Sequence, residues 1–188
     1  MSPITKQLNG VNVQRLTEAM ENMKSHPESA ILRHRAHNRW VEGGHSRTRI
    51  QDFNLGGKEM SRSMPFEIHG DEPPALLGED HGPGATEAML HALAACVSTT
   101  FIYHAAARGV KVDELNIELE AELDLRGILG LSSDVRNGYS RINMTFHVKA
   151  EASDEICRDL CELAKKHSPV FDMISHGVPV ETSWRRKA

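Results

Sequence analysis

One stretch of the sequence, residues 88–107 (AMLHALAACVSTTFIYHAAA), limits the possible folds more than any other, because it contains no Asp, Glu, Lys or Arg over twenty residues. About 20 apolar residues are enough to cross a bilayer as a helix. Two histidines, three consecutive hydroxyl residues and several weakly apolar alanines argue against a membrane span. An apolar helix within an otherwise polar chain is typical of the buried centre of a domain. We therefore predict a buried central helix and no membrane partner.

The composition favours one soluble globular domain. The chain has 188 residues, of which 39% are hydrophobic, and a formal net charge of −4. A negative net charge argues against nucleic acid as a partner, since a phosphate-backbone binder needs a surplus of Lys and Arg on one face. The N-terminus lacks the apolar core of a signal peptide, and three cysteines are too few for a disulfide scaffold. Both features predict a reducing, cytoplasmic location.

The first 29 residues are predicted to form an N-terminal helical extension, and residues 30–188 a single domain. Within the extension, apolar residues repeat at helical spacing at Val11, Leu16, Met20 and Met23. This pattern predicts a short helix that ends near His26-Pro27, because proline cannot continue a helix.

The domain begins with strand patterns. Residues 31–41 and 45–53 flank Glu42-Gly43-Gly44, which predicts a β-hairpin, and a further short strand is expected at 65–69. The segment 71–85 is rich in proline and glycine and is predicted to be a loop.

The second half of the domain alternates helix and strand patterns. Thr86 is the expected N-cap of the apolar helix, and Gly109 its C-terminal stop. Residues 115–123 and 142–148 alternate apolar and polar side chains, as in half-buried strands. A helix over 153–167 and a strand over 178–184 complete a predicted α+β fold. In that helix, Ser153 is the expected N-cap, and the inward residues are Ile156, Leu160, Leu163 and Ala164.

Cys96 lies near the middle of the predicted central helix, and two interpretations are open. A helical cysteine between alanines is commonly a small core residue. A reactive cysteine needs an electropositive neighbour such as arginine. Because Cys96 is roughly ten residues inside the helix, the charge at the helix end does not reach it, and any arginine must come from another element.

Cys157 and Cys161 are spaced i,i+4 on the last predicted helix and share its apolar stripe, which favours core packing over redox chemistry. They offer only two metal ligands, and His167 lies off their face. We therefore expect no metal and no cofactor.

Four sequence motifs lie in the predicted domain; they are GPGATEAMLHALAACVSTTFIYHAAARG, LDLRGILGL, VRNGYSRI and HSPVFDMISHGVPVE. Together they resemble the OsmC/Ohr family of thiol-dependent hydroperoxide reductases, in particular its longer OsmC-like members, and the resemblance covers roughly residues 30–184. The resemblance implies an intertwined α+β homodimer with buried central helices and with sites between the subunits.

The resemblance also implies residue roles. Cys96 matches the cysteine that attacks the peroxide, whereas Ser168 stands where the family's second, resolving cysteine belongs. In the family a glutamate helps to hold the arginine that activates the thiol; its position falls on Thr86 here, and Glu87 follows one residue later. Arg47 and Arg49 are candidates for the arginine that activates the thiol.

Two functions follow as competing hypotheses. In the first, the protein is a one-cysteine peroxidase that acts in oxidative stress on a small organic hydroperoxide, and an external thiol reductant resolves oxidised Cys96. In the second, a non-peroxidase OsmC-like stress protein binds a small apolar ligand at the dimer interface. A structural dimer module without chemistry is the third possibility.

Overall fold

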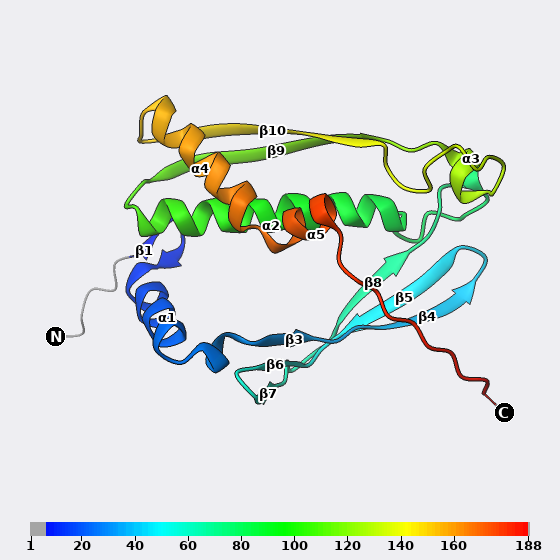
Figure 1. Ribbon diagram of the computed structural model, residues 1–188, viewed down its shortest axis with the longest axis horizontal. Coiled ribbons are helices and arrows are strands. Elements are labelled where there is room, and N and C mark those ends of the chain that lie inside the picture. The colour runs from blue at the N-terminus through cyan, green and yellow to red at the C-terminus, as the bar shows by residue number, and fades with distance from the viewer. Residues whose placement is uncertain (1–6, 188) are drawn as a thin grey trace. The chain divides into compact units, whose positions relative to one another are not determined.

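The computed structural model describes residues 7–187, which form an α+β fold as predicted (Figure 1). The chain divides into two compact units, Met1–His91 and Ala92–Ala188. One helix, α2 (Ala85–Ala107), contributes residues to both. The predicted domain boundary at residue 29 stays a prediction.

The predicted helix near the N-terminus is confirmed as α1 (Val13–Ser25). A small hairpin of β1 (Gln7–Leu8) and β2 (Val11–Asn12) precedes it. The side chain of Asn12 accepts a hydrogen bond of 3.0 Å from the backbone N–H of Arg15, which caps the helix. A short 3₁₀ helix, η1 (Pro27–Ala30), follows.

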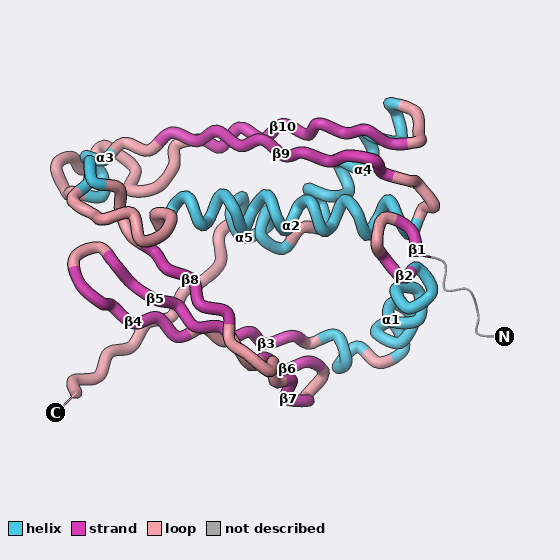
Figure 2. The backbone as a smooth tube through the Cα atoms, turned by 180° about the vertical axis from the view of Figure 1, so that it is seen from behind, coloured by secondary structure: helices cyan, strands magenta, loops and turns pink. Residues whose placement is uncertain are grey.

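The first unit holds two three-stranded antiparallel sheets, each of which contains one part of the predicted hairpin (Figure 2). One has the order β4-β5-β8 and the other β3-β6-β7. The strands are β3 (Leu32–His34), β4 (His37–Glu42), β5 (His45–Ile50), β6 (Phe53–Leu55), β7 (Lys58–Met60) and β8 (Phe66–Gly70).

The turn at Gly43-Gly44 is confirmed, but the prediction of one uninterrupted strand on each side of it was wrong. Strand β3 pairs with β6, which follows β5 after two residues, so the hairpin is interrupted at 35–36 and 51–52 and resumes with its register shifted by one residue. Arg35 lies where the first predicted strand breaks, and its guanidinium donates two hydrogen bonds of 2.8 Å to the carboxylate of Glu59 on β7. This long-range contact ties the break to the second sheet.

A cluster of three histidines and one aspartate anchors the loop between β8 and α2. His45 is 6% exposed, and its ring stacks on that of His81 with centroids 4.3 Å apart. His45 Nε2 also lies 3.0 Å from His69 Nδ1. Asp71, 4% exposed, accepts a 2.8 Å hydrogen bond from His81 Nδ1 and further bonds from the backbone N–H groups of Glu72, Glu79 and His81.

We expect Asp71→Asn to lower the melting temperature by several degrees, because asparagine has one acceptor oxygen where the loop presents four donors. The hydrogen bond from His81, together with those from the backbone, holds the pKa of Asp71 well below its ordinary value. A depressed pKa means that the ionised group stabilises the fold. Its contribution is complete above the unfolded pKa of about 4 and is lost as the pH falls through the folded pKa.

Urea unfolding of both proteins over a pH series checks this prediction. The difference in unfolding free energy between the parent protein and Asp71→Asn should be largest near neutral pH and should become smaller below about pH 4. Glu79→Gln is the matched control, because the Glu79 side chain is 78% exposed and lies 3.8 Å from His81 Nε2. A gap that widens on acidification would contradict the assignment.

Helix α2 confirms the predicted central helix, although its start and its burial differ from the prediction. The helix begins at Ala85, so Thr86 lies within the first turn and is not the N-cap. Gly109 ends it as predicted, with φ of +73° and the N–H of Val110 bonded to the carbonyl of Ala105. Among the helices of the described residues, α2 is the one that could cross a bilayer if only its length and its apolar composition are considered.

The helix is buried along one face in this chain, not all round as predicted. Leu93, Val97, Phe101 and Ala105 follow one another at intervals of four and are 0–3% exposed. His91, Ala95, Thr99 and Tyr103 repeat at the same interval and are exposed. Uniform apolar composition does not reveal which face the tertiary structure covers.

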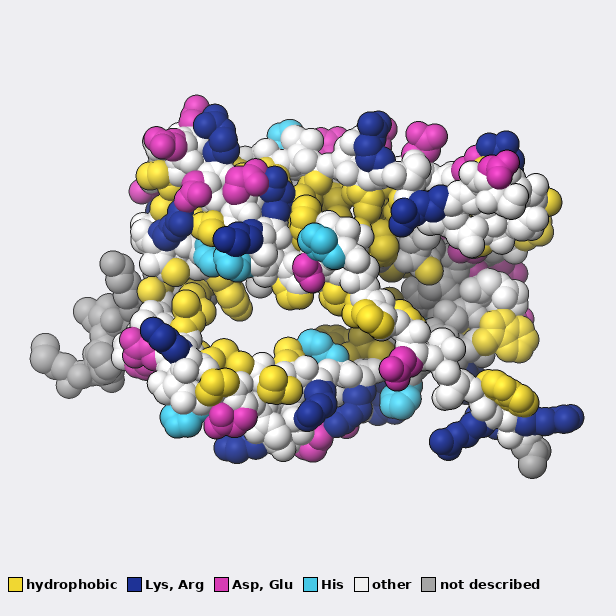
Figure 3. All heavy atoms as spheres, viewed as in Figure 1, with side chains coloured by type: hydrophobic (Ala, Val, Ile, Leu, Met, Phe, Trp, Pro, Cys, Tyr) yellow, Lys and Arg dark blue, Asp and Glu magenta, His cyan; other side chains and the backbone are white. Residues whose placement is uncertain are grey.

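The two predicted amphipathic strands form a long hairpin that lies along α2 in the second unit (Figure 1). They are β9 (Val112–Glu122) and β10 (Arg141–Ala150), and the short helix α3 (Leu125–Ile128) lies in their connection. The inward side chains pack against the core of α2; they include Ile117, Leu119, Ile142, Met144 and Phe146. Charged side chains of both signs cover α4 and the outer side of this hairpin (Figure 3).

Two further helices complete the second unit. The predicted α4 (Asp154–His167) has Ser153 as its N-cap, and it buries Leu160 and Ala164 as expected. Ile156, predicted to point inward, is 41% exposed because it lies in the first turn, beyond the edge of the core. Helix α5 (Pro169–His176) was not predicted. The predicted strand over 178–184 was wrong: this segment has no strand pairing, and Trp184 is 85% exposed.

Candidate functional site around Cys96

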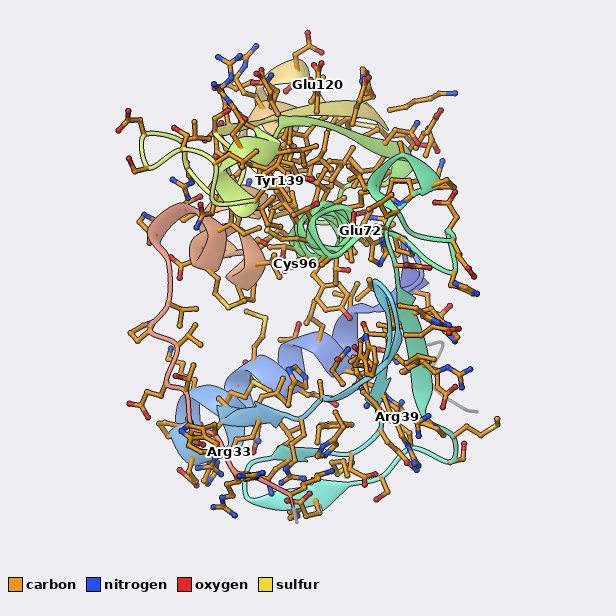
Figure 4. All side chains as sticks on the ribbon, turned by 90° about the vertical axis from the view of Figure 1, so that its right-hand side faces the viewer. Arg33, Arg39, Glu72, Cys96, Glu120 and Tyr139 are labelled. Carbon is orange, nitrogen blue, oxygen red and sulfur yellow. The ribbon has the colours of Figure 1, made fainter. Side chains whose placement is uncertain are left out.

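Cys96 lies at the margin of the buried face of α2. Its neighbour Val97 is fully buried and its neighbour Ala95 is exposed, so the thiol is partly buried. Figure 4, which looks along α2, shows Cys96 on the side of the helix next to α4 and α5. The Cys96 backbone carbonyl accepts a 2.8 Å hydrogen bond from the hydroxyl of Thr100. The thiol is therefore held by a regular helix at the edge of the core.

Ser168 contacts the Cys96 sulfur directly. Its Oγ lies 3.1 Å from Cys96 Sγ and donates a hydrogen bond to it. Ser168 is 0% exposed, and its backbone is both the C-cap of α4 and the N-cap of α5. Two residues that lie 72 positions apart in the sequence are therefore brought together, and both had been predicted as site residues.

Helix α5, which Ser168 caps, was not predicted. The pair Ser168-Pro169 is a typical helix start, since serine is a favoured N-cap and proline suits the first helical position. In the structure, Ser168 Oγ accepts a 3.2 Å hydrogen bond from the N–H of Phe171, as an N-cap does. This capping signal was present in the sequence and predicts α5.

The structure places Arg47 and Arg49 on one face of β5, exposed to solvent in the first unit. Their shared facing agrees with the predicted strand alternation. Arg47 lies opposite Arg39 on β4, and Arg49 lies opposite His37. Cys96 and Ser168 belong to the second unit, so neither arginine is in the same compact unit as the thiol. Their role in activating Cys96 stays a prediction.

Glu87 has a contact of its own at the start of α2. Its Oε2 accepts a 2.8 Å hydrogen bond from the backbone N–H of Gly84. A carboxylate that reaches back to a free N–H in this way stabilises a helix start. The predicted contact of Glu87 with an arginine stays a prediction.

The other two cysteines lie on α4. Cys161 packs against the core, and burial raises the pKa of its thiol, which keeps it protonated at neutral pH. Cys157 is partly buried beside it. Among residues 7–187, no group of three or more His, Cys, Asp or Glu side chains has the geometry of a metal site.

A family model described as OsmC-like protein matches residues 78–183, which is more than half of the chain. The chain belongs to the OsmC-like family. The match includes α2 with Cys96 and the α4–α5 junction with Ser168. No curated protein matches the sequence significantly.

Solved structures show the same fold. The chain is similar to an OsmC-like protein from Mycoplasma pneumoniae, with 17% identity, coverage of 77% of this chain and 88% of that one, and a TM-score of 0.59. The chain is also similar to an organic hydroperoxide resistance protein, OsmC, from Legionella pneumophila, with 14% identity, coverage of 77% of this chain and 90% of that one, and a TM-score of 0.50. A third similar structure is an OsmC-like protein of unknown function from Vibrio cholerae. It has 14% identity, coverage of 74% of this chain and 91% of that one, and a TM-score of 0.50. These matches confirm the predicted α+β OsmC-like fold.

Proposed function

We propose that this protein reduces organic hydroperoxides with Cys96 as the attacking thiol and an external thiol as the resolving partner. The observation that carries the proposal is the 3.1 Å contact between Cys96 Sγ and Ser168 Oγ. A resolving cysteine must lie against the attacking sulfur, and here the side chain in that place is a hydroxyl. Family membership and the similarity to a hydroperoxide resistance protein support the same reaction class.

The reaction is a two-electron transfer. The Cys96 thiolate attacks one oxygen of the peroxide, the O–O bond breaks, and the organic alkoxide leaves and takes up a proton to become the alcohol. Cys96 is then a sulfenic acid. An external thiol attacks the Cys96 sulfur and releases water, and a second thiol breaks the mixed disulfide and regenerates the Cys96 thiol. The peroxide is reduced by two electrons and two external thiols are oxidised.

The elements next to the site are apolar, which supports an organic peroxide as substrate. Val170 and Phe171 lie on α5, which Ser168 caps, and both pack against the apolar core. The proposal includes Arg47 or Arg49 as the cation that favours the Cys96 thiolate, Glu87 as the carboxylate that holds that arginine, a homodimeric assembly and a cytoplasmic location. An arginine close to a thiol increases its thiolate fraction, which is the reactive form.

The test is oxidation of the purified protein with one equivalent of tert-butyl hydroperoxide, followed by mass spectrometry of each cysteine. We expect one added oxygen on Cys96 alone, and continuous peroxide consumption when a thiol reductant is present. Cys96→Ser should reduce consumption to the rate of the uncatalysed reaction between thiol and peroxide. The double variant Cys157→Ser/Cys161→Ser should retain the parent rate.

Even oxidation of all three cysteines would contradict the proposal. So would full activity of Cys96→Ser. Saturable binding of an apolar probe without thiol oxidation would instead support the ligand-binding hypothesis.

A further inference from the structure

We propose that Ser168 is a positioning residue for Cys96, whose buried hydroxyl directs its proton at the sulfur and stabilises the thiolate. This inference deepens the proposed function, because that function starts from a Cys96 thiolate. It assigns a positive role to a residue that otherwise marks only a missing cysteine.

The first argument is the orientation of the hydroxyl proton. A serine hydroxyl has one donor and two acceptor positions. The N–H of Phe171 donates to Ser168 Oγ at 3.2 Å, which occupies an acceptor position. A Cys96 thiolate has no proton to donate, so the Ser168 hydroxyl proton is the group that bonds to it at 3.1 Å. The three groups form a chain of hydrogen bonds from the first turn of α5 to the sulfur.

The second argument is the surrounding medium. Ser168 is 0% exposed, so water does not compete for its hydroxyl. A hydrogen bond to an ionised acceptor is stronger than one to a neutral acceptor, and a low local dielectric strengthens it further. The contact therefore favours the thiolate over the thiol.

The titratable groups of neighbouring residues have other contacts. The ring of His167 lies 5.1 Å from that of His104, between centroids. Asp172, in the first turn of α5, pairs with His176 at 3.0 Å. Within residues 7–187, the polar side chain that forms a hydrogen bond with the Cys96 sulfur is that of Ser168.

The test measures alkylation of Cys96 by iodoacetamide in the full chain with Cys157→Ser and Cys161→Ser, so that Cys96 is the reacting thiol. We expect Ser168→Ala to lower the rate constant near pH 7 about three- to tenfold. This range combines two opposing effects. The hydrogen bond to a charged acceptor increases the thiolate fraction, and the lower nucleophilicity of a stabilised thiolate offsets part of the resulting gain in rate. At high pH, where thiols ionise without the help of a neighbouring donor, the Ala variant should be as fast as the parent or faster.

Two further variants separate this role from helix capping. Ser168→Gly removes the hydroxyl at a cap position that tolerates glycine, and it should behave like Ser168→Ala. Ser153→Ala removes the N-cap serine of α4, whose Oγ accepts from Ile156 N–H at 3.4 Å, and it should leave Cys96 alkylation unchanged.

An unchanged rate near pH 7 in both Ser168 variants would overturn the inference. A rate lowered by the same factor at every pH would also overturn it, because that pattern indicates altered access and not altered ionisation. Alkylation uses no peroxide, so the outcome is independent of the proposed function. If Cys96 alkylates as expected but consumes no peroxide, the proposed function fails and the role of Ser168 stands.

Discussion

Ser168→Cys is expected to convert the protein into one that forms an internal disulfide as soon as Cys96 is oxidised. Ser168 Oγ lies 3.1 Å from Cys96 Sγ, and a sulfur–carbon bond is longer than an oxygen–carbon bond, so the introduced sulfur would start at contact distance. A disulfide needs about 2.0 Å between the sulfurs, which a small side-chain rotation supplies. The new thiol attacks the Cys96 sulfenic acid, forms the S–S bond and releases water.

The effect of this substitution should be large because the two thiols would belong to one molecule. A tethered partner has an effective concentration in the millimolar range or above. We expect the variant to lose two hydrogens in mass and to give a linked peptide pair for residues 96 and 168, whereas the parent gains one oxygen on Cys96. The peroxide dose that causes irreversible overoxidation of Cys96 should rise about tenfold or more.

Two controls define the outcome. The double variant Ser168→Cys/Cys96→Ser should form no linked pair, and Ser168→Ala should oxidise without forming a disulfide. A parent protein that joins Cys96 to Cys161 under the same conditions would contradict the one-cysteine scheme. The absence of a linked pair in Ser168→Cys would contradict the placement of residue 168 against the sulfur.

Leu160→Ala is expected to destabilise the protein by about 2–5 kcal/mol, the range for truncation of a fully buried leucine. Leu160 is 0% exposed and belongs to the core cluster with Leu93, Val97 and Phe101 of α2. Loss of its side chain leaves a cavity between α4 and α2, whose contact also sets the position of Ser168. Chemical unfolding monitored by circular dichroism measures the change in unfolding free energy.

Ile156→Ala is the matched control, since Ile156 lies four residues earlier on the same helix and is 41% exposed. Its cost should be below that of Leu160→Ala by about 1 kcal/mol or more, because less apolar surface is lost from the interior. Equal losses for the two variants would mean that α4 does not face α2 as the structure shows.

Local patterns in the sequence predicted most elements of the second unit. Alternation from Leu115 and again from Ile142 placed β9 and β10, and Ser153 and Gly109 marked helix ends that the structure confirms. These signals are local because a strand or a helix repeats its burial along its own length. Where the same pattern lacked a pairing partner, at residues 178–184, it predicted a strand that does not form.

The first unit was harder to predict because its hairpin is interrupted and each half is extended by a different third strand. Strands β3 and β4 are consecutive in the chain but pair in different sheets, with β6 and β5 respectively. The cluster of His45, His69 and His81 around Asp71 joins a strand start, a strand end and a loop. No periodicity links such positions, so their contacts follow only from the packed structure.

The uncharged stretch 88–107 determined by its sequence alone that a long apolar helix forms there, and Cys96 stood out within it. The tertiary structure alone decided which face of that helix is buried and which side chain meets the sulfur. Helical periodicity specifies the burial of an apolar stripe only where polar residues mark the other side, and α2 has few. The contact of Cys96 with Ser168 depends on how α4 and α5 pack against α2, which is a property of the whole unit.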